Sequence, residues 1–344
     1  MQVRFWTHQL NFRHPFTISK GTKTFQPTLV VELTLGKWVG YGEAPSISYY
    51  PNSSLELMVA VLEKNKTLIE KFAFTDPERF WHYLHHLLPG QHFLIAALDI
   101  AGWDLYGKMK NKSLATIWQL PVHDGPITDF TIGIDTPEKM IEKLNERKWP
   151  VYKIKVGGPD DLHILSLLRT KTNAPFRVDA NAGWSLEEAV QLLPLLEKLG
   201  VELIEQPLAK ENWEGMSTLK SMSKIPLYAD ESCVAETDVA KCANYFHGIN
   251  IKLTKCGGIT PARRMIKEAR QVGLKIMLGS MNESTIGSAA LAHLRSLVDV
   301  LDIDGPLLLS QDLATGMAYE NGFLKLSDRA GLGIEFKGVI PSEH

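Results

Sequence analysis

Apolar and polar positions change their period along this chain, and the change separates an N-terminal region from the rest. Over residues 1–37 apolar side chains alternate with polar ones, beginning at Val3 and Phe5, which is typical of strands with one exposed face. Three stretches of helical spacing follow, at residues 54–72, 76–87 and 93–109. Strands followed by helices predict an α+β domain over residues 1–120.

Beyond about residue 125 the pattern becomes a repeat, in which a short apolar stretch ends in polar residues and a helix follows. Eight such stretches are predicted as strands, at residues 130–134, 152–156, 176–180, 203–206, 227–230, 249–253, 275–279 and 300–303. Helix starts are marked by Thr136 ahead of Pro137 and by a capping box that begins at Ser185. This alternation predicts an α/β fold, a modified TIM-type (β/α) barrel, over residues 121–317.

A doubly wound sheet is the structural rival of the barrel. No glycine-rich phosphate loop follows the first predicted strand, which weakens a dinucleotide-binding interpretation. Residues 318–344 alternate again, at Leu324 and Leu326, and are expected to return to the first domain. The architecture expected is therefore a barrel with an α+β capping domain formed from the N-terminal region and the C-terminal tail.

Composition and charge narrow the class of protein. The 344 residues are 44% apolar and 22% charged, which excludes a disordered chain. The 37 Lys and Arg residues against 39 Asp and Glu residues give a net charge of −2, which argues against a nucleic-acid partner. No apolar run reaches about 18 residues, so no membrane span is expected. A start without a signal-peptide pattern, and only three cysteines, favour a cytoplasmic location.

Charged side chains stand where the predicted strands end, and in such barrels the carboxyl ends of the strands carry the chemistry. From the second strand to the sixth, the residues presented are Lys153, Lys155, Asp179, Glu205, Asp230 and Lys252. The steps from position 155 to position 252 are 24, 26, 25 and 22 residues, about one strand–helix unit each. We therefore expect these side chains to converge on one mouth of the barrel.

Three carboxylates on neighbouring strands would repel one another if they were bare and close, and a divalent cation is the simplest resolution. Oxygen ligands with open positions suit Mg²⁺, and no histidine or cysteine pair shares this rim to favour zinc. The sequence therefore predicts one Mg²⁺ per subunit, held by Asp179, Glu205 and Asp230. The alternative is that these acids cap helices or pair with basic residues.

The lysines of the second and sixth strands are expected to lie across the mouth from each other. A free lysine has a pKa of about 10.4, and burial and cationic neighbours are expected to lower the lysine pKa here. Two lysines facing opposite sides of one carbon can remove a proton from one face and return one to the other, while the metal holds the enediolate. That is the chemistry of an epimerase or racemase acting α to a carboxylate. A purely structural ion-pair role is the alternative.

Two acids on the eighth predicted strand, Asp302 and Asp304, share one phase of that strand. A pair of carboxylates without an obvious ligand set can bind a substrate ammonium group. Helix capping or exposure to solvent is the alternative for both.

The strand-end motifs together resemble the enolase superfamily, and within it the muconate-lactonizing-enzyme subgroup. Members of that superfamily use a lysine or histidine base with Mg²⁺. The resemblance covers nearly the whole chain and rests on Lys153-Ile154-Lys155, Asp179-Ala180-Asn181, Glu205-Gln206-Pro207, Asp230-Glu231-Ser232 and Asn250-Ile251-Lys252.

Within the subgroup, the segment Asp302-Ile303-Asp304-Gly305 resembles the Asp-x-Asp motif of dipeptide epimerases, and residues 252–258 resemble them too. The resemblance implies that Lys155 and Lys252 are the acid/base pair and that Lys153, which is grouped with the substrate-binding candidates, modulates Lys155. It also implies that the two aspartates of the motif hold the ammonium of a dipeptide, while the dipeptide carboxylate binds the metal. The best-known members act on L-Ala-D/L-Glu from murein peptides. Lys255 is the rival of Lys252, but strand phase favours Lys252.

Substrate choice is expected to lie in the cap. Its loop at residues 19–24 brings Lys20 and Lys23, which suit an acidic substrate side chain, although a solvated basic loop is the alternative. Relatives acting on Ala-Glu often have arginine in this loop, and lysine loses the bidentate fork. Asn282, after the seventh strand, replaces a more usual apolar residue and is a further substrate-binding candidate.

Other functions are kept open. N-acylamino-acid racemase, o-succinylbenzoate synthase and muconate cycloisomerase of the same subgroup use similar metal and lysine residues but need no ammonium clamp. A non-catalytic binding barrel is the rival of another class. The partner expected is a small dipeptide, with neither nucleic acid nor membrane, and assembly into a homo-oligomer is left open by the sequence.

Overall fold

The computed structural model describes residues 1–121, 125–158 and 160–338. An antiparallel sheet opens the chain and has the strand order β1 (Gln2–Ile18), β2 (Gly21–Leu35), β3 (Trp38–Pro45). Three helices follow it, α1 (Leu55–Glu70), α2 (Pro77–Leu87) and α3 (His92–Lys110), and the short α4 (Leu114–Ile117) comes next. β1 and β2 confirm the strands predicted over residues 1–37, and α1, α2 and α3 confirm the three predicted helices, with helix ends that differ by one or two residues. β3 and α4 were not predicted.

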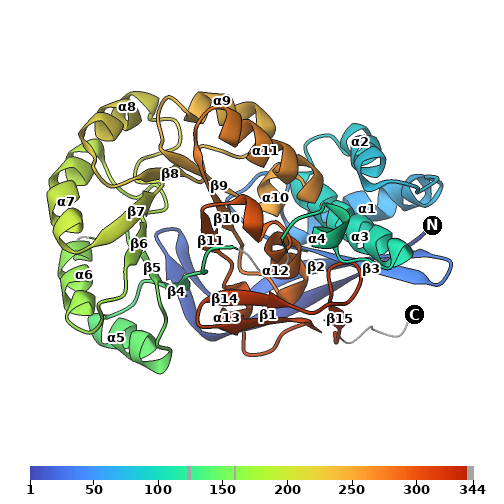
Figure 1. The fold of residues 1–344 in the computed structure, drawn as a ribbon, viewed down its shortest axis with the longest axis horizontal. Coiled ribbons are helices and arrows are strands. Elements are labelled where there is room, and N and C mark those ends of the chain that lie inside the picture. Colours follow the sequence, from blue (N-terminus) through green and yellow to red (C-terminus); the bar gives the residue numbers. More distant parts are fainter. Residues whose placement is uncertain (122–124, 159, 339–344) are drawn as a thin grey trace.

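Eight parallel strands form a second sheet, and Figure 1 shows helices α5 to α8 on the outer side of this sheet. Hydrogen-bonded neighbours follow chain order, β4 (Phe130–Ile132), β5 (Tyr152–Lys155), β6 (Phe176–Asp179), β7 (Val201–Glu205), β8 (Leu227–Ala229), β9 (Gly248–Ile251), β10 (Lys275–Gly279) and β11 (Val300–Asp302). A parallel bridge between Thr128 and Leu301 joins the first strand region to the last. The sheet is therefore a nearly closed barrel, as predicted, and not a doubly wound sheet.

Helices connect the strands of the barrel. The longer ones are α5 (Pro137–Glu146), α6 (Asp161–Arg169), α7 (Leu186–Lys198), α8 (Trp213–Met222), α11 (Ile259–Gln271) and α12 (Thr285–Ala292). Single turns are η1 (Glu236–Asp238), α9 (Val239–Cys242), α10 (Leu253–Cys256), η2 (Arg295–Leu297) and α13 (Gly305–Leu308). Both predicted helix starts are confirmed: Thr136 caps α5, and Ser185 and Glu188 form the capping box of α7.

The C-terminal segment contacts both parts of the molecule. Its hairpin, β13 (Met317–Glu320) and β14 (Phe323–Leu326), lies beside the barrel, where the ring of Tyr319 is 6.1 Å from that of Trp149. The strands β12 (Ala314–Thr315) and β15 (Glu335–Phe336) pair, and Phe336 stacks on Tyr41 of the N-terminal sheet at 4.9 Å. Residues 339–344 of the predicted returning segment lie outside the described residues.

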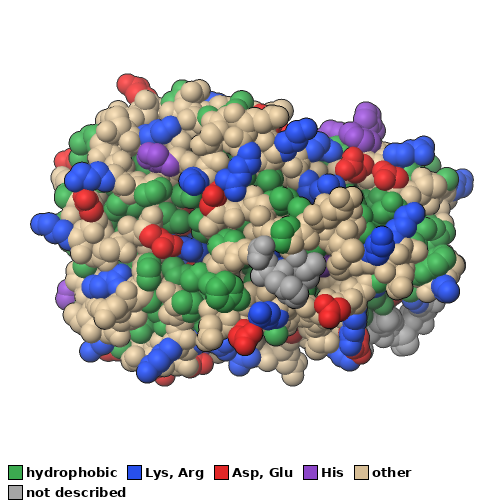
Figure 2. Space-filling model, viewed as in Figure 1, with side chains coloured by type: hydrophobic (Ala, Val, Ile, Leu, Met, Phe, Trp, Pro, Cys, Tyr) green, Lys and Arg blue, Asp and Glu red, His purple; other side chains and the backbone are tan. Residues whose placement is uncertain are grey.

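Charged side chains are mixed on the surface. On the face drawn in Figure 2, Lys and Arg are interspersed with Asp and Glu. Across the described parts of the chain, no helix combines the length and the apolar character needed to cross a membrane.

Close packing of α3 on β3 depends on glycine. A β-carbon added to Gly42 would lie 1.9 Å from the backbone oxygen of Ala97, and one added to Gly40 would lie 2.2 Å from that of Ala101. Because both obstacles are helix backbone, the sheet and the helix would have to separate to admit even a methyl group.

We therefore expect Gly42→Ala to lower the free energy of unfolding by about 1–3 kcal/mol, the usual cost of overpacking a core. Urea unfolding followed by circular dichroism measures this. Gly158→Ala is the matched control, because its added carbon would meet nothing closer than 3.8 Å. Equal stability of Gly42→Ala and the wild type would show that the helix and sheet are not held this closely.

Candidate active site

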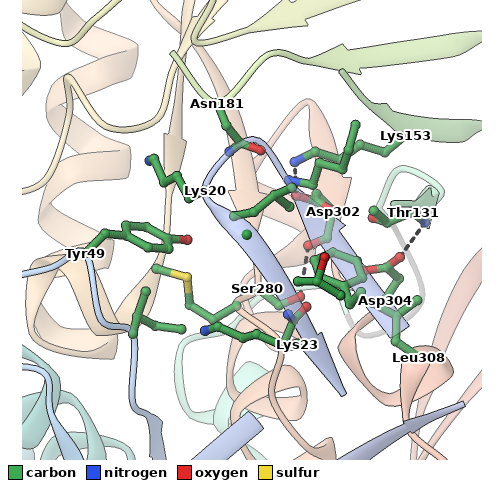
Figure 3. Close-up of a pocket in the computed structure, with 18 of the residues that line it drawn as sticks. Lys20, Lys23, Tyr49, Thr131, Lys153, Asn181, Ser280, Asp302, Asp304 and Leu308 are labelled. Atoms are coloured by element: carbon green, nitrogen blue, oxygen red, sulfur yellow. Dashed lines mark hydrogen bonds and ion pairs between the residues drawn. The ribbon is translucent and has the colours of Figure 1, made fainter. Parts of the chain in front are cut away.

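A cavity of about 240 Å³ lies where the β1–β2 hairpin meets the carboxyl ends of the barrel strands (Figure 3). The hairpin is fixed there by its tip, since the backbone oxygen of Thr17 accepts a hydrogen bond from Ile134 N at 2.9 Å. The predicted site residues that line the cavity are Lys20, Lys23, Lys153, Lys155, Lys252, Asn282, Asp302 and Asp304.

The three predicted metal ligands are not among the residues that line this cavity, and they lie at or just after the ends of three neighbouring strands. Asp179 ends β6, Glu205 ends β7 and Asp230 follows β8. All three are buried, with at most 2% of their surface exposed. Strand pairing sets Asp179 opposite Glu205, so adjacent parallel strands bring carboxylates into one layer.

Lysine ammonium groups lie among these acids. Lys153 Nζ is 2.6 Å from Glu205 Oε2, 2.6 Å from Asp302 Oδ2 and 3.0 Å from Asp179 Oδ2. Lys155 Nζ is 2.6 Å from the same oxygen of Asp179. Lys153 is almost fully buried, whereas Lys155 is partly exposed toward the cavity. Both lysines line the cavity, but Lys153 is held among three acids whereas Lys155 pairs with one.

On the other side of the barrel, Asp230 binds two lysines. Its Oδ2 is 2.8 Å from Lys252 Nζ, and its Oδ1 is 2.6 Å from Lys255 Nζ. Lys255 also donates to the backbone oxygens of Asp230, Cys233 and Asn250. Lys252 lines the cavity, whereas Lys255 is 1% exposed and does not. The structure thus places Lys252 where a substrate could reach it and uses Lys255 to hold the loop after β8.

Electrostatics at the site follow from this pairing. Burial alone would raise the pKa of Asp179, but Lys155 and Lys153 outweigh burial and lower it. Burial would likewise raise the pKa of Asp230, which Lys252 and Lys255 hold well below its usual value. Glu205 differs, because its burial and the charge of Asp179 raise its pKa to about 7.

The pKa values of Lys153 and Lys252 are raised, whereas the sequence predicted that burial, cationic neighbours and the metal would lower the lysine pKa. Burial does act in that direction on Lys153, but Asp302, Glu205 and Asp179 outweigh it and raise its pKa well above the ordinary value. The pKa of Lys252 is also raised, because Asp230 and Glu205 outweigh burial. The expectation counted cationic neighbours and missed how closely the acids surround each ammonium.

The donor chemistry of the site fits Mg²⁺. Asp179, Glu205 and Asp230 supply buried, hard oxygen donors from three adjacent strands, and their negative charge needs a cation. Lysines supply that charge here, so an ion would compete with the lysines for the same oxygens. Within the described residues, no three acidic, histidine or cysteine side chains are already gathered around one point to hold a metal.

Asp302 and Asp304 line the opposite wall of the cavity, next to the start of the barrel. Asp302 accepts from Lys153, and Asp304 Oδ2 accepts a hydrogen bond from Thr131 N at 2.6 Å, as the dashed lines of Figure 3 show. Burial and the charge of Asp302 raise the pKa of Asp304 to about 6. Burial would raise the pKa of Asp302 as well, but Lys153 outweighs burial and lowers it. The two carboxylates therefore form an acidic wall in which Asp302 is the more readily ionised.

The two lysines of the cap loop have different surroundings. Lys20 Nζ is 2.6 Å from Glu231 Oε1 and lies 4.2 Å from the centre of the Tyr49 ring. Lys23 donates to the uncharged amide oxygen of Gln26 at 3.2 Å, and burial lowers its pKa. Among the residues that the structure describes, Lys23 has no acidic partner. The charge of Lys20 is balanced within the protein, whereas that of Lys23 is not.

Several residues of the site were not found by sequence reasoning. Gln206 joins two strand ends, because its Oε1 accepts from the backbone N–H groups of Asp230 and Ser232 at 3.0 Å. It has a positive φ of 37°, a backbone conformation that often marks functional sites. Its place directly after Glu205 was the available signal. Phe16, Thr131 and Leu308 also line the cavity, and their apolar or weakly polar character gave no signal.

Comparison with known proteins gives matches along nearly the whole chain. The model for the mandelate racemase / muconate lactonizing enzyme N-terminal domain matches residues 1–118, and the enolase C-terminal domain-like model matches residues 136–339. An L-Ala-D/L-amino acid epimerase of Flavobacterium johnsoniae is 46% identical over 97% of this chain and 99% of its own length. An L-Ala-D/L-Glu epimerase of Bacteroides thetaiotaomicron is 35% identical over 97% of this chain and 88% of its own length.

Solved structures agree with these matches. A substrate-liganded complex of the L-Ala-D/L-Glu epimerase from Bacillus subtilis has a TM-score of 0.92 at 28% identity, covering 98% of this chain and 99% of that one. The dipeptide epimerase of Cytophaga hutchinsonii, complexed with Mg and D-Ala-L-Val, has a TM-score of 0.93 at 26% identity, covering 98% of this chain and 96% of that one.

Proposed function

The chain belongs to the mandelate racemase and muconate lactonizing enzyme family of the enolase superfamily, and from that premise we propose that it is a Mg²⁺-dependent dipeptide epimerase. The observation that carries the proposal is the pair of cavity-lining lysines, Lys155 at the end of β5 and Lys252 after β9. Three strands separate β5 from β9, so the two ammonium groups enter the cavity from opposite sides of the barrel.

In the proposed reaction, one lysine in its neutral form takes the α-proton from the C-terminal residue of the dipeptide. The C–H bond breaks, its electron pair stays on the substrate, and the proton becomes part of a lysine ammonium. The other lysine, as an ammonium, gives a proton to the opposite face of the same carbon. The configuration inverts, and the two lysines exchange protonation states. No proton is consumed.

Asp179, Glu205 and Asp230 would hold the Mg²⁺. When bound, the ion would supply Lewis-acid stabilisation of the negative charge that develops on the substrate carboxylate. Lys153 adds a fixed positive charge beside Lys155, since it lies within 3.0 Å of Asp179, the acid that also binds Lys155. Its burial among three acids suits a role in modulating that lysine, and Lys153 also lines the cavity.

The substrate we propose is L-Ala-D/L-Glu of the kind found in murein peptides. Asp302 and Asp304 would bind the dipeptide ammonium, because they form the acidic wall of the cavity. Lys23 is the cation best placed to receive the glutamate carboxylate, since no acid of the described chain neutralises it, and Lys20 and Asn282 would flank that carboxylate. The two relatives above whose names specify L-Ala at the first position support this choice.

A dipeptide library in D₂O tests the proposed function. Wild-type enzyme with Mg²⁺ is expected to introduce deuterium at the α-carbon of the second residue and to form the second epimer, with L-Ala-L-Glu among the best substrates. Mass spectrometry and chiral chromatography measure the two events.

N-Acetyl-L-Ala-L-Glu is the matched control in this assay, because acetylation removes the ammonium without changing the reacting carbon. We expect its turnover to fall by at least about 10-fold, in line with losing a charge-assisted contact. Unchanged turnover of the acetylated compound would favour an N-acyl amino acid racemase. Absence of α-proton exchange in every dipeptide would contradict the dipeptide epimerase.

A further inference from the structure

The active-site cavity shares a wall with a second, smaller cavity. The second cavity measures about 40 Å³, and Phe16, Thr131 and Leu308 line both. Behind this wall it is bounded by apolar Phe130 and Leu307. Its other lining residues include His14 and Glu146, which form a hydrogen bond of 2.7 Å between His14 Nε2 and Glu146 Oε2.

The shared wall stands at the end of the active site that would hold the first residue of a dipeptide. Thr131 donates its backbone N–H to Asp304, and Leu308 belongs to α13, whose N-cap is Asp304. In Figure 3, Thr131, Asp304 and Leu308 lie together on one side, whereas Tyr49 and Lys20 lie on the other. If the ammonium lies at the acids, the side chain on the same carbon contacts this wall, and the second residue points to the cap loop.

We propose that Phe16 determines how large the side chain of the first substrate residue can be. This inference rests on the proposed function and adds to it a residue that limits the side chain accepted at the first position of the dipeptide. The ring of Phe16, together with Leu308, separates the main cavity from the second one, so only a small side chain such as that of alanine fits in front of it. Removing the ring joins the two cavities and admits a branched apolar side chain.

Apolar side chains packed against Phe16 hold it in place in the wall between the two cavities. Its ring lies 5.8 Å from that of Phe12, and both belong to a small apolar cluster with Leu10 and Leu309. Phe12 lines neither of the two cavities, although it comes from the same strand and the same cluster. Phe12→Ala is therefore a matched control, because it removes the same ring from the apolar cluster without opening the wall between the two cavities.

The test compares L-Ala-L-Glu with L-Leu-L-Glu in wild type, Phe16→Ala and Phe12→Ala, with kcat/KM measured by deuterium incorporation. The ratio of L-Leu-L-Glu to L-Ala-L-Glu is expected to rise by about 10-fold or more in Phe16→Ala, since a single methylene in an apolar pocket is already worth about 10- to 200-fold. In Phe12→Ala the ratio is expected to stay within about twofold of wild type. A milder Phe16→Leu variant keeps the test available if Phe16→Ala does not fold, and its ratio is expected to rise less.

An unchanged ratio in both Phe16 variants would overturn the inference, and so would an equal rise in Phe12→Ala. In either case L-Ala-L-Glu would still be turned over by the wild type, so the proposed function would stand. Failure of the proposed function gives a different result, because the wild type would then exchange the α-proton of neither dipeptide.

Discussion

Replacing Lys252 with alanine is expected to abolish epimerisation of L-Ala-L-Glu, with kcat lower by at least about 10²–10⁴-fold, and Lys155→Ala is expected to do the same. Each lysine serves one face of the α-carbon, so the loss of either stops inversion although the other remains. Chiral chromatography of the product measures the effect. Calorimetric titration with Mg²⁺ is expected to show binding in both variants, because neither lysine belongs to the proposed ligand set.

Lys255→Met is the control for the second base. Lys255 donates three hydrogen bonds to the loop after β8 and one to Asn250 of β9, and it does not reach the cavity, so its replacement is expected to reduce stability by about 3–5 kcal/mol, as for a broken buried ion pair. The folded fraction is expected to keep the ability to invert the substrate. Retained epimerisation in Lys252→Ala together with its loss in folded Lys255→Met would reverse the assignment of the two lysines.

Removing divalent metal is the second change with a large expected effect. Dialysis against EDTA is expected to reduce epimerisation to background, and added Mg²⁺ is expected to restore it, because three buried carboxylates would otherwise face a substrate carboxylate. Lysines balance those acids in the structure, so the protein is expected to stay folded without the ion. Circular dichroism measured beside activity separates loss of metal from unfolding.

Glu205→Gln and Glu231→Gln form a matched pair for this test. Glu205 belongs to the proposed ligand set, whereas Glu231 pairs with Lys20, although it directly follows Asp230 in the chain. Glu205→Gln is expected to weaken Mg²⁺ binding in calorimetry by about 10-fold or more, and Glu231→Gln is expected to leave Mg²⁺ affinity within about twofold. Full activity after exhaustive EDTA treatment would remove the metal from the account.

Much of the site was predictable because it follows strand periodicity. Side chains alternate between the two faces of a strand, so Lys153 and Lys155 of β5 lie on the same face. Near-regular steps of about 24 residues put the acids at successive strand ends. The same phase argument favoured Lys252 over Lys255, and the structure does place Lys252 on the cavity wall. These features depend only on the alternation of side chains along each strand and on the rule that the carboxyl ends of barrel strands carry the chemistry.

Features that depend on contacts between distant segments were not predictable in this way. Lys20 and Lys23 have equal charge in the sequence, and only the fold shows that Glu231 neutralises the first while Lys23 binds an amide. The raised pKa values of Lys153 and Lys252 were not foreseen for the same reason, since they depend on distances between strands. Phe16 lies in the cap hairpin and meets the barrel only through tertiary packing.

The most direct test of the central claim, that two lysines act on opposite faces of one carbon, is α-proton exchange in D₂O with Lys252→Ala and Lys155→Ala, each supplied with L-Ala-L-Glu and L-Ala-D-Glu separately. The remaining lysine can still take and return a proton on its own face, so each variant is expected to introduce deuterium into one epimer only, without inversion. The two variants are expected to choose opposite epimers. Exchange of both epimers by a single-lysine variant would contradict the two-face account.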